Sequence, residues 1–280
     1  CYRILCDVES RRMHSDAALN SEPMLRLDAR DRNLTTEIVY GTLRWQAPLD
    51  HVLAASGSRP WDRVDAGVKT LLRMSLYQLW RMDRVPAYAV VHDAVELAKR
   101  RLRRGAEGYV NGVLRALART RPWEEAAFLG TAPLHVRASL PRWLWERWRA
   151  RYGEEAAMEY ALSLTAPPRA AFRFAAPTGA GDAPPVPASP SGLVPGAFLR
   201  DAPAGSPEAE GSSDARIQYQ DEASQLIPHL LRPLEGMRVW DACAAPGGKT
   251  GILARLCGPS GSVTAGDSRQ ERVSRLVRSL

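Results

Sequence analysis

The sequence is poor in cysteine, and its four cysteines (Cys1, Cys6, Cys243 and Cys257) include no Cys-x-x-Cys pair. This spacing argues against a zinc site or a disulfide framework and favours a reducing compartment. No apolar run approaches the roughly 18 residues that a membrane-spanning helix needs. The first residues contain neither an initiating Met nor an apolar signal segment. We therefore expect a cytoplasmic monomer without a bound metal, and a chain that begins inside a helix as a fragment of a longer protein.

A chain of 280 residues is long enough for two or three domains. Residues 2–165 have helical periodicity throughout, whereas residues 175–213 are rich in Pro, Gly, Ala and Ser and predict loops. Short strands are expected at 172–174 and 197–199. The predicted fold is multidomain: an all-α domain over 1–130, a small α+β linker region over 131–215, and the start of an α/β domain over 216–280.

Two local patterns in the helical part give specific expectations. Residues 31–44 place Leu34 and Ile38 on one apolar face, with Val39 as a further candidate, and Gly41 interrupts this apolar pattern. The aromatic and basic segment 141–148 favours a helix whose large side chains pack in a core. The alternative is that its Trp and Arg side chains stack on nucleic-acid bases.

Positive charge is concentrated in one stretch. Residues 99–121 hold eight basic side chains against Glu107 alone, so their net charge (8 − 1 = +7) equals that of the whole chain, +7. Such a patch attracts phosphate backbones, although a solvated helix end in an Arg-rich protein is the alternative. The residues predicted to bind RNA are Lys99, Arg100, Arg101, Arg103, Arg104, Arg115 and Arg119.

Several segments of the helical part resemble the NusB-type RNA-binding domain. They are Asp31–Arg32, Tyr40–Trp45, Leu71–Leu79, Val85–Ala87, Val95–Lys99 and Val110–Arg115. The resemblance implies RNA binding, in agreement with the charge pattern. The glycine-rich residues 105–108 are expected to present the N-terminus of a helix at 109–113, where a phosphate could bind. Asn111 is interpreted as either a helix cap or a polar core residue.

A second constellation of residues lies near the end of the chain. A predicted strand at 239–242 leads into a loop of small residues, Cys243 to Gly248, and then into a helix at 249–256. A second strand, 262–267, ends in Asp267, which lies 19 residues after Gly248. That interval is typical of a βαβ unit whose second acidic residue binds ribose hydroxyls.

The residues of this loop distinguish between three kinds of ligand. A phosphate-binding NTPase loop would need Gly at position 243, which is Cys, and the dinucleotide pattern G-x-G-x-x-G is absent. A ligand with adenosine and no phosphate remains, and S-adenosylmethionine is the favoured candidate. Asp267 would then accept hydrogen bonds from ribose. Alternatively, Asp267 caps a helix that begins at Ser268.

The segment Asp241-x-Cys-Ala-Ala-Pro-Gly-Gly-Lys-Thr, preceded by Gln220-Asp-Glu-Ala-Ser-Gln225, resembles the Nop/Sun family of RNA cytosine-5 methyltransferases. With the NusB-like segments in front, the resemblance is to the 16S rRNA enzymes of the Sun/Fmu type. It implies a Rossmann-like methyltransferase domain, S-adenosylmethionine as the cofactor and rRNA as the partner. Trp240 and Gly266 are mild departures from the family pattern. The implied cofactor contacts are Cys243, Ala244, Ala245, Pro246, Gly247, Gly248, Lys249 and Asp267.

The resemblance also implies two catalytic cysteines, one adding to cytosine C6 and one assisting release, in Pro-Cys and Thr-Cys motifs. We expect both beyond Leu280, and neither Cys243 nor Cys257 has the required context. The chain itself is therefore expected to have no catalytic residue and to transfer no methyl group. One alternative is a NusB-like RNA-binding or transcription-regulatory module with a vestigial cofactor loop. Another is a methyltransferase with a different substrate.

Overall fold

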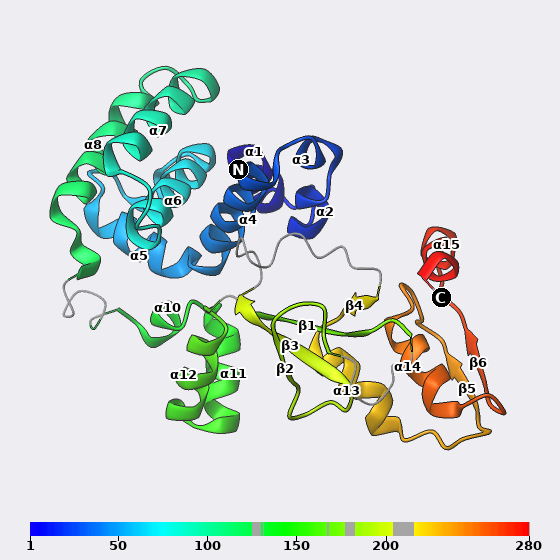
Figure 1. Ribbon diagram of the computed structural model, residues 1–280. Coiled ribbons are helices and arrows are strands. Elements are labelled where there is room, and N and C mark those ends of the chain that lie inside the picture. The colour runs from blue at the N-terminus through cyan, green and yellow to red at the C-terminus, as the bar shows by residue number, and fades with distance from the viewer. Residues whose placement is uncertain (125–129, 131, 167, 177–182, 204–215, 280) are drawn as a thin grey trace. The chain divides into compact units, whose positions relative to one another are not determined.

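The computed structural model describes residues 1–124, 130, 132–166, 168–176, 183–203 and 216–279 (Figure 1). These residues form two compact units, Cys1–Ala166 and Pro167–Leu280. The first unit is all-helical and the second is mixed α/β. The division into three domains at 130 and 215 stays a prediction.

The first unit consists of α-helices joined by short connections and two 3₁₀ turns. They are α1 (Tyr2–Glu9), α2 (Ser15–Leu19), α3 (Glu22–Leu25), α4 (Ala29–Arg44), α5 (Gln46–Ser56), η1 (Trp61–Arg63), α6 (Ala66–Arg81), α7 (Ala87–Arg101), α8 (Ala106–Thr120), η2 (Pro122–Glu124), α10 (Leu134–Arg137), α11 (Arg142–Tyr152) and α12 (Glu154–Ser163). Helix α6 packs against α1, α4, α5, α7 and α8. Its residues Leu71, Leu72 and Leu76 are fully buried, as their helical spacing predicts.

One expectation for α4 is wrong. Leu34 is 43% exposed, whereas Ile38 and Val39 are buried. Gly41 interrupts the apolar pattern, but the helix itself continues through it to Arg44. The missing side chain serves packing between helices, because the ring of Tyr77 from α6 lies against this glycine.

A smaller core joins α10, α11 and α12. Ala138, Trp145, Ala157 and Ala161 are its buried residues. The prediction that segment 141–148 packs in a core is confirmed for Trp145, which is 3% exposed. It is wrong for Trp143, which is 65% exposed, because this residue lies on the opposite side of a helix that is buried along one stripe only.

The second unit begins with a four-stranded antiparallel sheet of strand order β2-β3-β1-β4. Its strands are β1 (Arg169–Phe174), β2 (Ala188–Pro190), β3 (Ala197–Pro203) and β4 (Ile217–Tyr219). The strands predicted at 172–174 and 197–199 are confirmed. The loop-rich segment 175–213 contains one strand that was not predicted, β2, which pairs with β3, and Phe198 of β3 stacks on Phe172. Residues 177–182 and 204–213 of that segment lie outside the described residues.

The rest of the second unit alternates helices and strands. Helix α13 (Glu222–Leu231) precedes β5 (Arg238–Asp241), α14 (Gly248–Cys257), β6 (Ser262–Ala265) and α15 (Gln270–Ser279). Strands β5 and β6 are parallel, with α14 as the crossover between them (Figure 1). The strand–loop–helix–strand order predicted for this segment is confirmed.

Candidate functional site

The carboxyl ends of β5 and β6 lie side by side. Asp241 of β5 pairs with Ala265 of β6 at the end of the register, so both strands end at the same edge of the sheet. The loop after β5 is tied to the segment after β6, because the amide of Ala244 donates to the carbonyl of Gly266 at 2.9 Å and the amide of Gly266 donates to the carbonyl of Asp241 at 2.9 Å. Open parallel sheets bind ligands at this edge.

Two adjacent glycines form the start of α14. Gly247 has φ of 109°, a left-handed conformation that favours glycine, and it precedes the first helical residue. Gly248 leaves space for another side chain, because a Cβ at this position would lie 2.7 Å from Oε1 of Gln220. That oxygen is buried and has no hydrogen-bond partner among the described residues. Residues 220–225 were part of the family resemblance, but the sequence did not indicate that Gln220 lies beside the loop.

The two acidic residues at the strand ends have different surroundings. Oδ2 of Asp241 accepts a hydrogen bond of 2.8 Å from the hydroxyl of Thr250, which fixes it against α14. The side chain of Asp267 is 4% exposed, and its Oδ1 lies 3.4 Å from the amide of Arg269 and 3.9 Å from Arg272. Both contacts are long, and α15 begins only at Gln270. Asp267 is therefore not the N-cap of a helix starting at Ser268, and its carboxylate retains acceptor capacity.

Arg173 of β1 supports the same loop, and the sequence did not indicate this role. It is 4% exposed and donates a hydrogen bond of 2.9 Å to the carbonyl of Gly248. Burial, together with the nearby positive charge of Arg255, lowers the pKa of Arg173 to about 10. The guanidinium is therefore still charged at neutral pH. It connects the antiparallel sheet to the first residue of α14.

The cysteines of the second unit differ in accessibility. Cys243 is exposed in the loop, and Cys257 is buried at the end of α14. Within the described ranges, no cluster of three or more His, Cys, Asp or Glu side chains could hold a metal ion. The same ranges contain no helix that is both long and apolar enough to cross a membrane.

The predicted RNA-binding residues separate into three groups. Lys99 and Arg100 form ion pairs with Glu96, at 2.6 and 3.9 Å, and Arg101 is exposed at the end of α7. Arg103 and Arg104 line a cavity of about 310 Å³. Arg59, Arg63 and Tyr109 also line this cavity, and Arg103 lies 3.6 Å from Asp65 there. Arg115 and Arg119 line a different groove.

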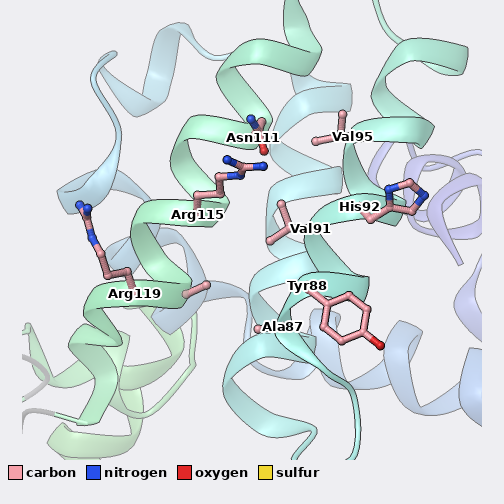
Figure 2. Close-up of a pocket in the computed structure, with 9 residues that line it drawn as sticks. Ala87, Tyr88, Val91, His92, Val95, Asn111, Arg115 and Arg119 are labelled. Atoms are coloured by element: carbon pink, nitrogen blue, oxygen red, sulfur yellow. The ribbon is translucent and has the colours of Figure 1, made fainter.

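That groove lies between α7 and α8 and has a volume of about 600 Å³. Figure 2 shows Arg115 and Asn111 on α8 facing Val91 and Val95 on α7, with Arg119 at the margin of α8 and Tyr88 and His92 at the margin of α7. Asn111 is neither a cap nor a buried core residue: it is half-buried, lies in the second turn of α8 and makes no side-chain hydrogen bond within the described part of the chain.

The helix expected to begin at residue 109 starts earlier, and the phosphate expected at its N-terminus stays a prediction. Helix α8 begins at Ala106, three residues earlier than predicted, with Gly105 in a left-handed conformation before it. The carboxylate of Glu107 accepts a hydrogen bond of 2.9 Å from the amide of Gly105. This end of the helix therefore already has an anionic partner, which disfavours a phosphate.

Comparisons with known proteins agree with this arrangement. Residues 2–119 match the NusB family, and residues 228–280 match the family described as 16S rRNA methyltransferase RsmB/F. The helical part of the chain is thus similar to the NusB family, and its last residues are similar to the RsmB/F methyltransferases. This domain order confirms the resemblance to the Sun/RsmB family inferred from the sequence.

The relatives are consistent with these matches. The "Probable ribosomal RNA small subunit methyltransferase B" of Bacillus subtilis is 33% identical, over 96% of this chain and 62% of its own length. The "Ribosomal RNA small subunit methyltransferase B" of Pseudomonas putida is 33% identical, over 94% of this chain and 62% of its own length. The chain therefore spans less than two thirds of these relatives. The crystal structure of PH0851 has a TM-score of 0.62 at 22% identity, over 88% of this chain and 57% of that one, and shares the fold.

Proposed function

We propose that this chain is the RNA-binding part and the beginning of the cofactor site of a 16S rRNA cytosine-C5 methyltransferase that uses S-adenosylmethionine. Residues 216–280 would start a Rossmann-like methyltransferase domain, and the helical domain before it would hold RNA. The observation that carries the proposal is Asp267: a nearly buried carboxylate with only long contacts, beside a glycine-rich loop at the carboxyl ends of two parallel strands.

The residues present suit such a cofactor. The loop 243–249 combines small side chains with a left-handed glycine, so a ligand can approach its backbone closely. One oxygen of Asp241 accepts a hydrogen bond from Thr250, whereas Asp267 has only long contacts, and we assign Asp267 as the acceptor for ribose hydroxyls. When bound, S-adenosylmethionine would supply the methyl group. The chain's own residues would hold and orient it, and we assign the acceptor chemistry to none of the described residues.

The cofactor part of the proposal is tested by measuring S-adenosylmethionine binding to the 280-residue chain by calorimetry. Asp267→Asn should weaken binding at least tenfold, because hydrogen bonds to charged groups contribute about 1.5–3 kcal/mol. Glu271→Gln, which removes an exposed carboxylate four residues away, is the matched control and should bind like the unchanged chain. Equal binding by the Asp267 variant would contradict the assignment.

The reaction is tested with the protein encoded by the complete reading frame. Transfer of a labelled methyl group from S-adenosylmethionine to unmodified 16S rRNA should be detected, and the product should be 5-methylcytosine. A methylated base other than cytosine would refute the C5 assignment. RNA binding without any affinity for S-adenosylmethionine would instead support a NusB-like module with a vestigial loop.

A further inference from the structure

We infer that the groove between α7 and α8 binds an unstacked nucleotide of single-stranded RNA, an inference that rests on RNA being the partner proposed above. The groove combines an apolar floor, an exposed aromatic ring and two arginines. Its lining includes Tyr88, Val91 and Val95 from α7 and Asn111, Arg115 and Arg119 from α8.

The charge of the groove favours an anionic occupant. Arg115 and Arg119 are one helical turn apart on α8 and exposed, and neither forms an ion pair with another described residue. None of the described residues that line the groove is acidic. Arg115 and Arg119 differ in this respect from Lys99 and Arg100. The charges of those two residues are partly offset by Glu96. Two guanidinium groups on the α8 side of the groove, without acidic partners among the described residues, provide contacts for phosphate oxygens.

The apolar and aromatic residues favour a base over a simple anion. Val91, Val95 and Ala118 provide apolar side chains to the lining, and Tyr88 at the margin is 79% exposed. A tyrosine held so far out of the core gains little from folding, whereas a ring at a groove margin can stack on a base. The amide of Asn111 lies between the two helices, where it can bind a base edge (Figure 2).

Single-stranded RNA fits this combination better than a duplex. In a duplex the bases are stacked on one another, so an apolar floor and an exposed ring have no base face to contact. Sequence-tolerant proteins that bind single strands join a basic surface to aromatic rings in the same way. An acidic peptide would use the two arginines but would not need the ring of Tyr88.

The experiment measures binding of the 280-residue chain to a fluorescein-labelled 12-nucleotide RNA of mixed sequence, and to the same RNA as a duplex, at several salt concentrations. Tyr88→Ala should weaken single-strand binding between about fivefold and a hundredfold and leave the salt dependence unchanged. Tyr88→Phe keeps the ring and should bind normally. Both changes are at an exposed position and should leave the helical content, measured by circular dichroism, unaltered.

Changes at the two arginines should alter the salt dependence of RNA binding. Arg115→Gln and Arg119→Gln should each reduce the slope of log K against log salt by about 0.7, the value for one phosphate contact on a single strand. Arg30→Gln removes an exposed charge on α4 that has no ion pair among the described residues, and it is the matched control. It should change neither the slope nor, by more than twofold, the affinity.

The outcomes distinguish a failure of the groove inference from a failure of the proposed function. If the chain binds RNA and the Tyr88 and Arg115 variants bind equally well, the groove is not the site and the RNA partner stands. A Tyr88→Ala effect of the same size on the duplex would also overturn the inference, because stacking on an unpaired base could not explain it. If the unchanged chain binds neither RNA, the inference and the RNA partner fail together.

Discussion

Gly41 of α4 lies directly against the aromatic ring of Tyr77 on α6: a Cβ added to this glycine would be 1.9 Å from Cζ of the tyrosine. Atoms cannot approach so closely, and the ring is 4% exposed, so it has little room to move. The tyrosine hydroxyl also donates a short hydrogen bond to Glu37, one turn before the glycine. The pair therefore sets the separation of the two helices.

Gly41→Ala should destabilise the first unit by about 2–3 kcal/mol, because inserting a methyl group into a packed interface forces neighbouring groups to shift. The loss should be smaller when Tyr77→Leu is also present, since the ring that clashes is then absent. Urea unfolding followed by tryptophan fluorescence reports this unit, because every tryptophan except Trp240 lies in it.

Gly112→Ala is the matched control for this prediction. Gly112 lies inside α8, and a Cβ there would meet nothing within 4 Å. Alanine should therefore stabilise the helix by up to about 1 kcal/mol. A destabilisation at Gly112 as large as that at Gly41 would show that packing against Tyr77 is not the cause.

The sequence was sufficient to predict elements whose burial follows a simple period. The apolar spacing in α6 and the strand–loop–helix order from β5 to β6 agree with the structure, because each depends on neighbours along the chain. Arg173 and Gln220 could not be predicted as supports of the loop. The contact of Arg173 with Gly248 joins residues 75 positions apart, and no local pattern indicates such a contact.

For the basic stretch 99–121, too, only part of the arrangement could be predicted from the sequence. Its charge was evident from the sequence, and Arg115 and Arg119 share a helix face because they are four residues apart. Which cavity each arginine would line was not predictable, since this depends on how α7 and α8 pack. The contribution of Tyr88, which precedes the stretch by eleven residues, was likewise missed.

Arg73 forms a second testable feature of the first unit, a nearly buried ion-pair network with Asp50 and Glu9. Its Nε and a terminal nitrogen donate to Asp50 at 2.6 and 2.8 Å, and the other terminal nitrogen donates to Glu9 at 2.8 Å. Burial lowers the pKa of Arg73, but the hydrogen bonds and charges of the two carboxylates outweigh it, and the pKa is raised above its ordinary value.

Asp50→Asn should therefore destabilise the first unit by about 2 kcal/mol or more, because a buried guanidinium loses its bidentate partner. Asp62→Asn changes an exposed carboxylate of the same unit and should alter the unfolding free energy by less than about 0.5 kcal/mol. Equal unfolding midpoints for the two variants would contradict the role given to Asp50.

Gly248 provides a test of the cofactor loop. In Gly248→Ala, the new methyl group would lie 2.7 Å from Oε1 of Gln220, so either the glutamine or the start of α14 must move. S-adenosylmethionine affinity should fall roughly fivefold, in line with about 1 kcal/mol for mild overpacking. Adding Gln220→Ala should restore most of the affinity, whereas an additive loss in the double variant would exclude this contact as the cause.

Substitutions of Arg173 should affect the stability of the chain and its affinity for S-adenosylmethionine differently. The side chain is 4% exposed and bonds to the carbonyl of Gly248, but its Nε has no partner within the described ranges, and Arg255 adds a like charge nearby. Replacing such a group with an apolar residue of similar length is often neutral or stabilising. Arg173→Met should therefore leave the melting temperature of the chain unchanged or raised.

The same substitution should weaken S-adenosylmethionine binding, because the first residue of α14 loses its anchor to β1. Arg173→Lys is the informative partner variant: it keeps a buried charge but lacks the guanidinium that reaches the carbonyl of Gly248. It should lower both the melting temperature and the affinity. If the lysine variant were more stable than the methionine variant, the buried charge would not be the unfavourable feature of this site, and the explanation would be wrong.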